Sequence, residues 1–264
     1  MQINRPADRY PFRTAMVTGA SSGIGEAMVR LLANAGVRTV VVARRLDRLA
    51  DLAASLDAVE VLAADLTTDA GLALTCERLS DDLRPIDLVV NNAGFGTSGQ
   101  FYTLDPARLA QEIRLNVSAL TQLSHAAVVP MVARKSGWLL NVSSVASFQP
   151  VPGLAVYAAT KAFVTSFSEA LHEELRSSGV KVTALCPGLT RTEFQSVSNM
   201  SDAASAYPSV AWLSAEKVAR DGLAAAAHGK ALSVPGIAYK GLVSGSRLAP
   251  RALVRRIAGL ARHH

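Results

Sequence analysis

The sequence predicts an α/β protein with a single doubly wound domain, in which a parallel sheet of about seven strands is flanked by helices. Short runs rich in valine and leucine alternate along the chain with longer stretches that carry apolar residues at helical spacing. The short runs are apolar on both faces, which is typical of strands buried in a parallel sheet. No linker interrupts the alternation, and half of the 264 residues are hydrophobic, which is enough for one large core.

Six apolar runs are expected to be strands, and a seventh is a candidate. The six cover residues 14–18, 39–43, 58–63, 86–91, 138–143 and 180–186, and the candidate is ALSV at 231–234. The helical stretches between them cover residues 23–35, 45–56, 68–83, 106–134 and 156–177. Regular alternation of strand and helix favours a parallel sheet over a helical bundle or a β-sandwich.

Composition and cysteine content exclude several classes of protein. No run of about 20 uninterrupted apolar residues occurs, so no membrane span is expected. The N-terminal sequence lacks the apolar centre of a signal peptide. The two cysteines, Cys76 and Cys186, match no metal-binding spacing, and neither do the five scattered histidines. We therefore expect a cytoplasmic protein with reduced thiols and no metal site.

The net charge of +6 is concentrated near the C-terminus. Residues 240–264 contain no acidic side chain and six basic ones: Lys240, Arg247, Arg251, Arg255, Arg256 and Arg262. The remainder of the chain is neutral, whereas a nucleic-acid-binding protein usually spreads its basic residues over a folded face. We therefore expect no nucleic-acid partner.

A glycine-rich turn, TGASSGIG at residues 18–25, follows the first expected strand and precedes a helix. Because Gly19, Gly23 and Gly25 lack side chains, the chain can turn tightly and a pyrophosphate can approach the main chain. The strand–turn–helix context is the one that a dinucleotide site requires, and a glycine-rich turn without a ligand is the alternative. The same turn contributes three further expected contacts, namely Ser21, Ser22 and Ile24.

The end of the second strand indicates which nicotinamide cofactor is preferred. Sites for NAD place an acid there to bind the ribose 2′-hydroxyl, whereas a 2′-phosphate requires a cation. The sequence VVVARR places Arg44 and Arg45 at this end, and Asp47 lies beyond it, at the start of the next helix. Since an arginine can bind a phosphate with two hydrogen bonds, we expect NADP(H) to be preferred over NAD(H).

The segment YAATK places Tyr157 and Lys161 one helical turn apart, on the same face of the expected helix. Two ordinary surface side chains would also have this spacing. The functional interpretation is that the lysine cation favours the phenolate, lowers the pKa of the tyrosine and makes its proton easier to transfer.

Six motifs occur in an order that resembles the short-chain dehydrogenase/reductase family. They are TGASSGIG, NNAG (91–94), Asn116, SS (143–144), YAATK and PGLTRT (187–192), and they span most of the chain. The ARR sequence after the second strand is similar to that of the NADP-preferring group of the family. The resemblance implies an NADPH-dependent oxidoreductase that interconverts a carbonyl compound and its alcohol by hydride transfer.

The resemblance also implies catalytic roles for four residues. Tyr157 matches the acid that protonates the carbonyl oxygen, and Lys161 matches the residue that lowers its pKa and binds the nicotinamide ribose. Ser144, which lies 13 residues before the tyrosine, would hold the substrate oxygen. Ser143 is the alternative, because neighbouring strand residues face opposite sides of a sheet. Asn116 matches the asparagine that keeps a proton-carrying water beside the lysine, with local main-chain bonding as the alternative.

Further positions match cofactor contacts of the family. We expect Asn91 to stabilise the sheet and its neighbours to line the site, and Asp65 resembles the acid that contacts the adenine. Pro187 and Gly188 would turn the chain over the nicotinamide. The expected cofactor contacts from these motifs are Asp65, Leu66, Asn92, Ala93, Gly94, Pro187, Gly188, Thr190 and Thr192.

We expect three segments in the chain. Residues 1–12 would form a flexible lead-in, 13–247 the Rossmann-like catalytic domain, and 248–264 a basic amphipathic C-terminal helix. Residues 193–212 are rich in serine and alanine and break the helical periodicity. Because so long a loop in a compact domain is usually functional, this segment is a candidate substrate lid.

The C-terminal helix would separate apolar and basic residues onto opposite faces. Pro250 suits its first turn. One arc would carry Leu253, Val254, Ile257, Leu260 and Ala261, and the opposite one Arg251, Arg255 and Arg262. Such a helix could make peripheral contact with the inner membrane face. We favour the alternative, in which its apolar face packs on the protein or on a second subunit.

The apolar segment FQPVPGLAV at residues 148–156 favours a hydrophobic substrate, such as a ketone or an oxo-lipid. The family resemblance implies a homodimer or homotetramer, formed through the long helices after the fourth and fifth strands. A non-catalytic nicotinamide-binding sensor or scaffold, associated with a membrane through the basic tail, is the competing hypothesis. The complete set of four catalytic residues argues against it.

Overall fold

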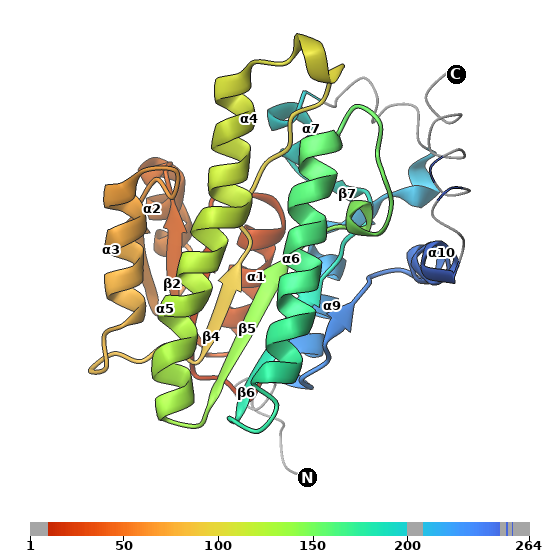
Figure 1. Ribbon diagram of the computed structural model, residues 1–264. Coiled ribbons are helices and arrows are strands. Elements are labelled where there is room, and N and C mark those ends of the chain that lie inside the picture. The colour runs from red at the N-terminus through yellow and green to blue at the C-terminus, as the bar shows by residue number, and fades with distance from the viewer. Residues whose placement is uncertain (1–9, 200–207, 249–251, 253–254, 256–264) are drawn as a thin grey trace.

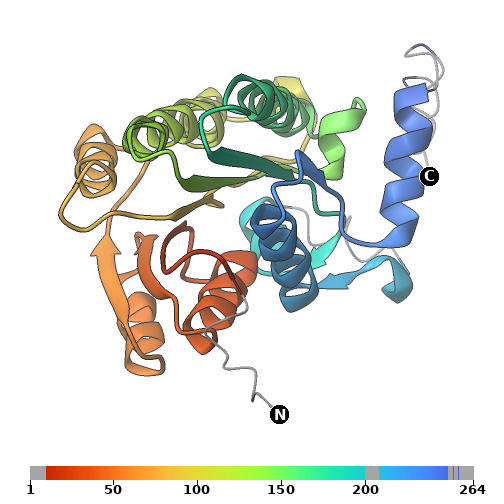
Figure 2. The same cartoon turned by 90° about the horizontal axis from the view of Figure 1, so that it is seen from below.

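The computed structural model describes residues 10–199 and 208–248, together with residues 252 and 255. One seven-stranded parallel sheet, of strand order β3-β2-β1-β4-β5-β6-β9, lies between two layers of helices (Figures 1 and 2). The prediction of a single Rossmann-like domain is therefore confirmed. The strand order reverses at the β1–β4 boundary, and in such sheets the crevice at the carboxyl ends of the strands there is the usual ligand site.

The seven strands form at the seven apolar runs, with ends that differ by at most two residues from those predicted. They are β1 (Thr14–Thr18), β2 (Arg38–Ala43), β3 (Val59–Ala63), β4 (Leu88–Asn91), β5 (Gly137–Val142), β6 (Val180–Leu185) and β9 (Leu232–Ser233). All neighbouring pairs are parallel. Two short strands, β7 (Thr190–Arg191) and β8 (Leu213–Ser214), pair separately near the carboxyl edge.

The described residues form nine α-helices. They are α1 (Gly23–Asn34), α2 (Leu46–Ala54), α3 (Asp69–Leu79), α4 (Pro106–Ile113), α5 (Leu120–Ala133), α6 (Ala155–Glu174), α7 (Phe194–Val197), α9 (Ala215–Ala227) and α10 (Ile237–Leu248). Helices α1, α2 and α9 cover one face of the sheet, and α3, α5 and α6 cover the other (Figure 2). Neighbouring residues of β1 serve opposite layers, since Val17 packs in the first and Met16 in the second.

Two helical features differ from the sequence prediction. The stretch predicted as one helix over 106–134 is divided by a π-helical segment, η3 (Arg114–Ala119), in which the main chain is locally underwound into a wider turn. Helix α9 was not expected, yet it buries Val218 and Leu223 against the core. Its start carries a signal that could have revealed it, since Ser214 caps the helix by accepting from Lys217 N at 3.2 Å.

The described end of the expected lead-in belongs to the folded body. Phe12 is buried, stacks on Tyr10 and meets Trp138 edge to face. The predicted boundary at residue 12 is therefore wrong for residues 10–12, because the two rings add apolar area to the first core layer.

The C-terminal region differs from the prediction as well. Helix α10 begins at Ile237, well before Pro250, and most of the expected basic helix over 248–264, including its apolar arc, lies outside the described residues. No helix in the described part of the chain is long and apolar enough to cross a bilayer. The same residues contain no cluster of three or more side chains arranged to hold a metal ion.

Candidate active site

The glycine loop between β1 and α1 lies at the carboxyl end of β1, next to the strand β4 at the centre of the sheet. Gly19 and Gly23 have φ angles of +65° and +60°, which residues with side chains rarely adopt. A Cβ atom on Gly25 would lie 2.4 Å from the main-chain oxygen of Gly19, so only glycine fits there. The loop therefore brings bare main chain to the start of α1, and this cradle fits the pyrophosphate of a dinucleotide.

The loop is held in place by the turn after β4. The Asn92 amide donates to the main-chain oxygens of Thr18 and Gly19, at 2.9 and 3.2 Å. The Thr18 hydroxyl in turn accepts from the main-chain N–H groups of Asn92 and Ala93. Asn92 was predicted to contact a cofactor, but its side chain is occupied in supporting the phosphate loop. The role of Thr18 in supporting the phosphate loop was not predicted, because its sequence position indicates only the end of a strand.

Tyr157 and Lys161 are both buried on α6, with 8% and 5% of their surface exposed. The Lys161 ammonium lies 5.8 Å from the centre of the tyrosine ring and donates to the main-chain oxygen of Val142 at 2.8 Å. The pair is therefore not made of ordinary surface side chains.

The two adjacent serines after β5 point in different directions. The Ser143 hydroxyl is buried, where it donates to the Lys161 main-chain oxygen at 2.8 Å and lies 2.7 Å from the Thr165 hydroxyl. Ser144 is half-buried, and its hydroxyl is near enough to the Tyr157 phenol to act on the pKa of that phenol. Its oxygen also accepts from Ala146 N at 3.1 Å, which caps the short helix η4 (Val145–Phe148). The structure thus directs Ser144 toward the tyrosine and Ser143 away from it.

Asn116 lies in the π-helical segment η3 and reaches across to the loop after β4. Its amide donates to the main-chain oxygen of Phe95 at 2.8 Å and accepts from Phe95 N at 3.2 Å. A second donation, at 3.1 Å, goes to the hydroxyl of Thr160, which the sequence analysis did not single out. These partners are far from Asn116 in sequence, so its side chain does not serve local main-chain bonding. Segments of π-helix are frequent at functional sites.

Gly94 brings Asn116 and Lys161 together. A Cβ atom at Gly94 would lie 2.9 Å from the Asn116 Oδ1 atom and 3.4 Å from the Lys161 Nζ atom. The bare main chain of this glycine is therefore what allows the amide and the ammonium to approach the same point at the carboxyl end of β4.

Burial shifts the proton affinities of both groups on α6. It raises the pKa of Tyr157 to about 12, although the hydrogen bond with Ser144 acts in the opposite direction. It lowers the pKa of Lys161 from 10.5 to about 8. The expected net lowering of the phenol pKa is therefore wrong for this structure, because the loss of solvent around a phenolate is the largest effect.

Helix α7 covers the tyrosine from the segment predicted as a lid. The Phe194 ring lies 5.3 Å from that of Tyr157, centre to centre. At the other end of α7, the Ser198 hydroxyl accepts from Gly96 N at 3.1 Å, and its main-chain oxygen accepts from Ser98 N. Residues 193–199 therefore lie directly over the site, whereas residues 200–207 of the expected lid lie outside the described residues.

The PGLTRT turn is fixed by α10. A Cβ atom at Gly188 would lie 2.1 Å from the Tyr239 ring, so the ring packs flat against the bare turn. The Tyr239 hydroxyl accepts from Leu189 N at 3.0 Å and donates to the main-chain oxygen of Ala211 at 2.8 Å. On the other side, Val145 N donates to the Pro187 oxygen at 2.9 Å. No sequence motif pointed to Tyr239, because its partners are distant in the chain.

The two threonines of this turn stabilise main chain. The buried Thr190 hydroxyl donates to the Gly188 oxygen at 2.9 Å. The Thr192 hydroxyl accepts from Phe194 N at 3.2 Å, and its Cβ and Cγ2 atoms lie 3.0 Å from a Cβ atom built on Gly23. The turn thus touches the phosphate loop directly.

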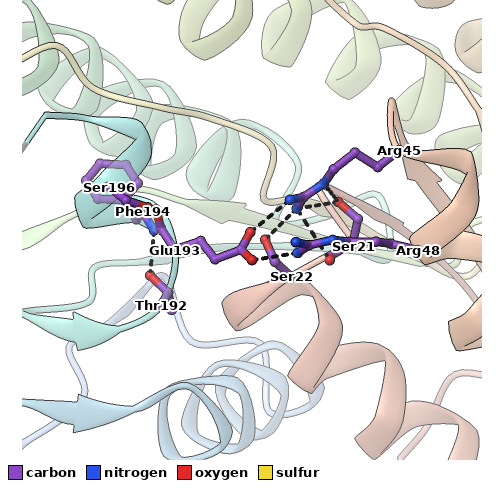
Figure 3. A network of polar contacts seen from close by, with 8 residues as sticks. All are labelled: Ser21, Ser22, Arg45, Arg48, Thr192, Glu193, Phe194 and Ser196. Carbon is purple, nitrogen blue, oxygen red and sulfur yellow. Dashed lines mark hydrogen bonds and ion pairs between the residues drawn. The ribbon is translucent and has the colours of Figure 1, made fainter.

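The arginines after β2 lie beside the phosphate loop in different environments. Arg44 is largely exposed and lies 3.9 Å from the Asp65 carboxylate. Arg45 donates to the Ser21 hydroxyl at 2.9 Å and to the Ser22 hydroxyl at 3.0 Å (Figure 3). Asp65 accepts from the main chain and hydroxyl of Thr67. The side chain of its neighbour Leu66 packs in the second core layer, so this residue could meet a ligand only through its main chain.

A sheet of this order, with its phosphate loop at the switch point, defines a nucleotide-binding doubly wound α/β protein. Within that class the chain belongs to the short chain dehydrogenase family, whose model matches residues 13–203. It is 38% identical, over 192 residues, to an uncharacterized oxidoreductase of Myxococcus xanthus, covering 71% of this chain and 76% of that protein.

Two solved structures are similar over most of the chain. A short-chain dehydrogenase from Sphingobium yanoikuyae in complex with NADPH is 36% identical, with a TM-score of 0.81 and coverage of 89% of this chain and 93% of that one. The bulky-bulky ketone specific alcohol dehydrogenase from Comamonas testosteroni is 30% identical, with a TM-score of 0.77 and coverage of 89% and 92%.

Proposed function

We propose that this oxidoreductase uses NADPH to interconvert a hydrophobic carbonyl compound and its alcohol, with Tyr157 as the general acid and base. The observation that carries the proposal is the buried Tyr157, which lies beside Ser144 and one helical turn from Lys161, at the carboxyl end of the sheet beside the phosphate loop. A phenol with a raised pKa holds its proton until a substrate oxygen gains negative charge, which suits an acid for carbonyl reduction.

Each residue of the site has a role in this proposal. The bound nicotinamide would supply the hydride that reaches the carbonyl carbon. Tyr157 gives its proton to the carbonyl oxygen, and the Ser144 hydroxyl donates a hydrogen bond to the same oxygen as charge develops on it. The positive charge of the Lys161 ammonium stabilises the phenolate that remains, and the ammonium is placed to bind the ribose hydroxyls. Asn116 would hold a water that returns a proton to Lys161.

The surroundings of the phosphate loop support NADPH over NADH. Arg44 and Arg45 lie at the end of β2, and Arg45 already contacts the serines of the loop. Two guanidinium groups favour a ribose 2′-phosphate, and an acid at this position would repel it. The NADPH complex of the Sphingobium relative is consistent with this choice.

A bulky ketone is the substrate class that we propose. One apolar ring, that of Phe194, lies against the tyrosine, and Phe95 belongs to the loop after β4 to which Asn116 is hydrogen-bonded. The name of the Comamonas relative points to bulky ketones for that enzyme. A panel of small and bulky ketones, assayed by NADPH consumption, tests the proposal, and turnover confined to small polar carbonyls would contradict it.

A fluorescence titration with NADPH and NADH tests the cofactor. We expect tighter binding of NADPH, and loss of about 10- to 100-fold in its affinity in Arg44→Ala and Arg45→Ala, with little effect on NADH, because each variant removes charged hydrogen bonds to the 2′-phosphate. Tighter binding of NADH by the unaltered protein would contradict the preference. Binding of neither nucleotide would contradict the enzymatic function.

We further propose that the protein is a homodimer or homotetramer through α5 and α6. Val129, Val132 and Phe163 are exposed on these helices, and Phe163 stacks on Phe167. Light scattering after size-exclusion chromatography tests this, and a monomer at micromolar concentration would contradict it. A cytoplasmic location stays a prediction. Peripheral membrane contact through residues 248–264 stays the less favoured alternative to packing of this tail on the protein, and sedimentation with anionic vesicles tests it by comparing the chain with and without the tail.

A further inference from the structure

The carboxylate of Glu193 joins the segment before α7 to the phosphate-binding side of the site. Its two oxygens accept from different guanidinium groups, one from Arg45 at 2.9 Å and the other from Arg48 at 2.5 Å. Figure 3 shows the carboxylate between the two arginines, with Ser21 and Ser22 beside them. Glu193 and Arg45 are 148 residues apart in sequence, so only the fold brings them together.

These donors are the kind that a phosphate monoester requires. Two guanidinium groups and two serine hydroxyls converge at the end of β2 and the start of α1. Arginine binds carboxylates and phosphates through the same planar arrangement of N–H groups. A carboxylate with one oxygen on each arginine therefore uses donors that a ribose 2′-phosphate would otherwise receive.

The charge on Glu193 is present over the whole ordinary pH range. The hydrogen bonds from Arg48 and Arg45 lower the pKa of this carboxyl from 4.5 to about 2. All three side chains are partly exposed, between 40% and 44%, so solvent and ligands can reach the ion pairs. An ion pair in such a position is worth little by itself and is open to exchange with another anion.

We propose that Glu193 determines cofactor specificity as an internal counter-anion, which a 2′-phosphate must displace from Arg45 and Arg48. The inference rests on the proposed use of a nicotinamide nucleotide at this site. NADH has no 2′-phosphate and can bind while the carboxylate stays in place. Glu193 therefore reduces the preference for NADPH over NADH that Arg44 and Arg45 create. The contact between the arginines and the 2′-phosphate replaces the ion pairs that they already make with Glu193, so only the difference contributes to affinity.

A different role for the same contact makes the opposite prediction. If the Glu193–Arg45 pair were a clasp that closes over any bound dinucleotide, its loss would weaken NADPH and NADH together. The ratio of the NADH to the NADPH dissociation constant therefore distinguishes the two roles. Loss of a clasp would leave this ratio unchanged, whereas loss of a counter-anion would change it.

Glu193→Gln tests the proposal, because the amide keeps the size of the side chain and removes its charge. We expect the ratio of the NADH to the NADPH dissociation constant to rise about 3- to 10-fold in fluorescence titrations, with NADH affinity almost unchanged. The same variant should bind 2′,5′-ADP, which carries the phosphate without the nicotinamide, more tightly by a similar factor, and 5′-AMP with unchanged affinity. Glu193→Asp keeps the charge, but its side chain is too short to reach both arginines. The ratio of its two dissociation constants should therefore lie between that of the unaltered protein and that of Glu193→Gln.

Glu173→Gln is the matched control. This exposed glutamate pairs with Arg176 at the end of α6, so the variant removes one negative charge without touching the site. An unchanged ratio in Glu193→Gln, or equal weakening of both nucleotides, would overturn the proposal while leaving the enzymatic function intact. If the unaltered protein binds neither nucleotide, the proposed function itself fails, and that outcome is visible before any variant is compared.

Discussion

The Lys161 ammonium donates a 2.8 Å hydrogen bond to the main-chain oxygen of Val142, in a side chain that is only 5% exposed. The cation is thereby held between the end of β5 and the helix that carries Tyr157. Burial lowers the pKa of this lysine from 10.5 to about 8, so the folded protein keeps a charge where the surroundings disfavour it. Burial of the Lys161 ammonium is therefore expected to lower the free energy of unfolding of the protein.

Lys161→Met should make the protein more stable and inactive. Below pH 8 the lysine is charged in both the folded and the unfolded chain, so its desolvation opposes folding in full. Between pH 8 and 10.5 the folded protein loses the proton first, and the stability of the unaltered protein rises. We expect a gain on the order of 2 kcal/mol in the variant below pH 8, after allowing for the lost bond to Val142, and a smaller gain toward pH 10.5.

Chemical denaturation at several pH values measures this difference. Lys217→Met is the control, because Lys217 is half exposed and pairs with Asp221 on the surface of α9, and we expect little change from it. A Lys161→Met protein that is less stable than the unaltered one at pH 7 would show that the hydrogen bond to Val142 outweighs the burial of the charge.

Tyr157→Phe should abolish turnover and leave cofactor binding intact. The variant keeps the ring that packs against Phe194 and removes only the acidic hydroxyl. We expect a loss of roughly 10²–10⁴-fold in turnover, which is the usual contribution of a positioned acid. Tyr102→Phe, at a side chain that is 83% exposed, is the control. If Tyr157→Phe keeps more than about a tenth of the activity, another group donates the proton.

Ser144→Ala and Ser143→Ala should separate catalysis from stability. Ser144 lies beside the phenol, so its loss should lower turnover by roughly 10²-fold, with only a small change in the midpoint of unfolding. Ser143 is buried against Lys161 and Thr165, so its loss should reduce stability by about 1–2 kcal/mol and leave turnover close to normal. Turnover and thermal unfolding of both variants measure this, and the reverse pattern would assign the catalytic role to Ser143.

Tyr239→Phe should weaken both nicotinamide nucleotides to a similar extent. The hydroxyl is hydrogen-bonded to Leu189 and Ala211, so its loss frees the turn after β6 without emptying the space over Gly188. We expect affinities to fall about 3- to 10-fold and stability to fall by about 1 kcal/mol. Titration with both nucleotides measures the effect. Unchanged affinities together with reduced stability would show that Tyr239 serves the fold alone.

The strands could be predicted from the sequence almost to the residue. Runs such as 14–18 and 180–186 are apolar on both faces, and only a sheet covered on both sides accommodates them. The glycine loop was also predictable, because positive φ at Gly19 and Gly23 is a local requirement of the chain. The π-helical segment around Asn116 was not, since the apolar pattern of α4 and α5 runs through it without a break.

The sequence by itself determined the strands of the sheet, their order along the chain and the family, because periodicity and short motifs are carried by residues close together in the chain. The tertiary structure decided which of two adjacent serines faces Tyr157, and that the Asn92 amide supports the phosphate loop. It also decided that the pKa of the tyrosine rises, and that Glu193 meets Arg45 and Arg48. These properties depend on burial and on contacts between segments far apart in the chain, and both exist only after the sheet and its two helical layers have packed together.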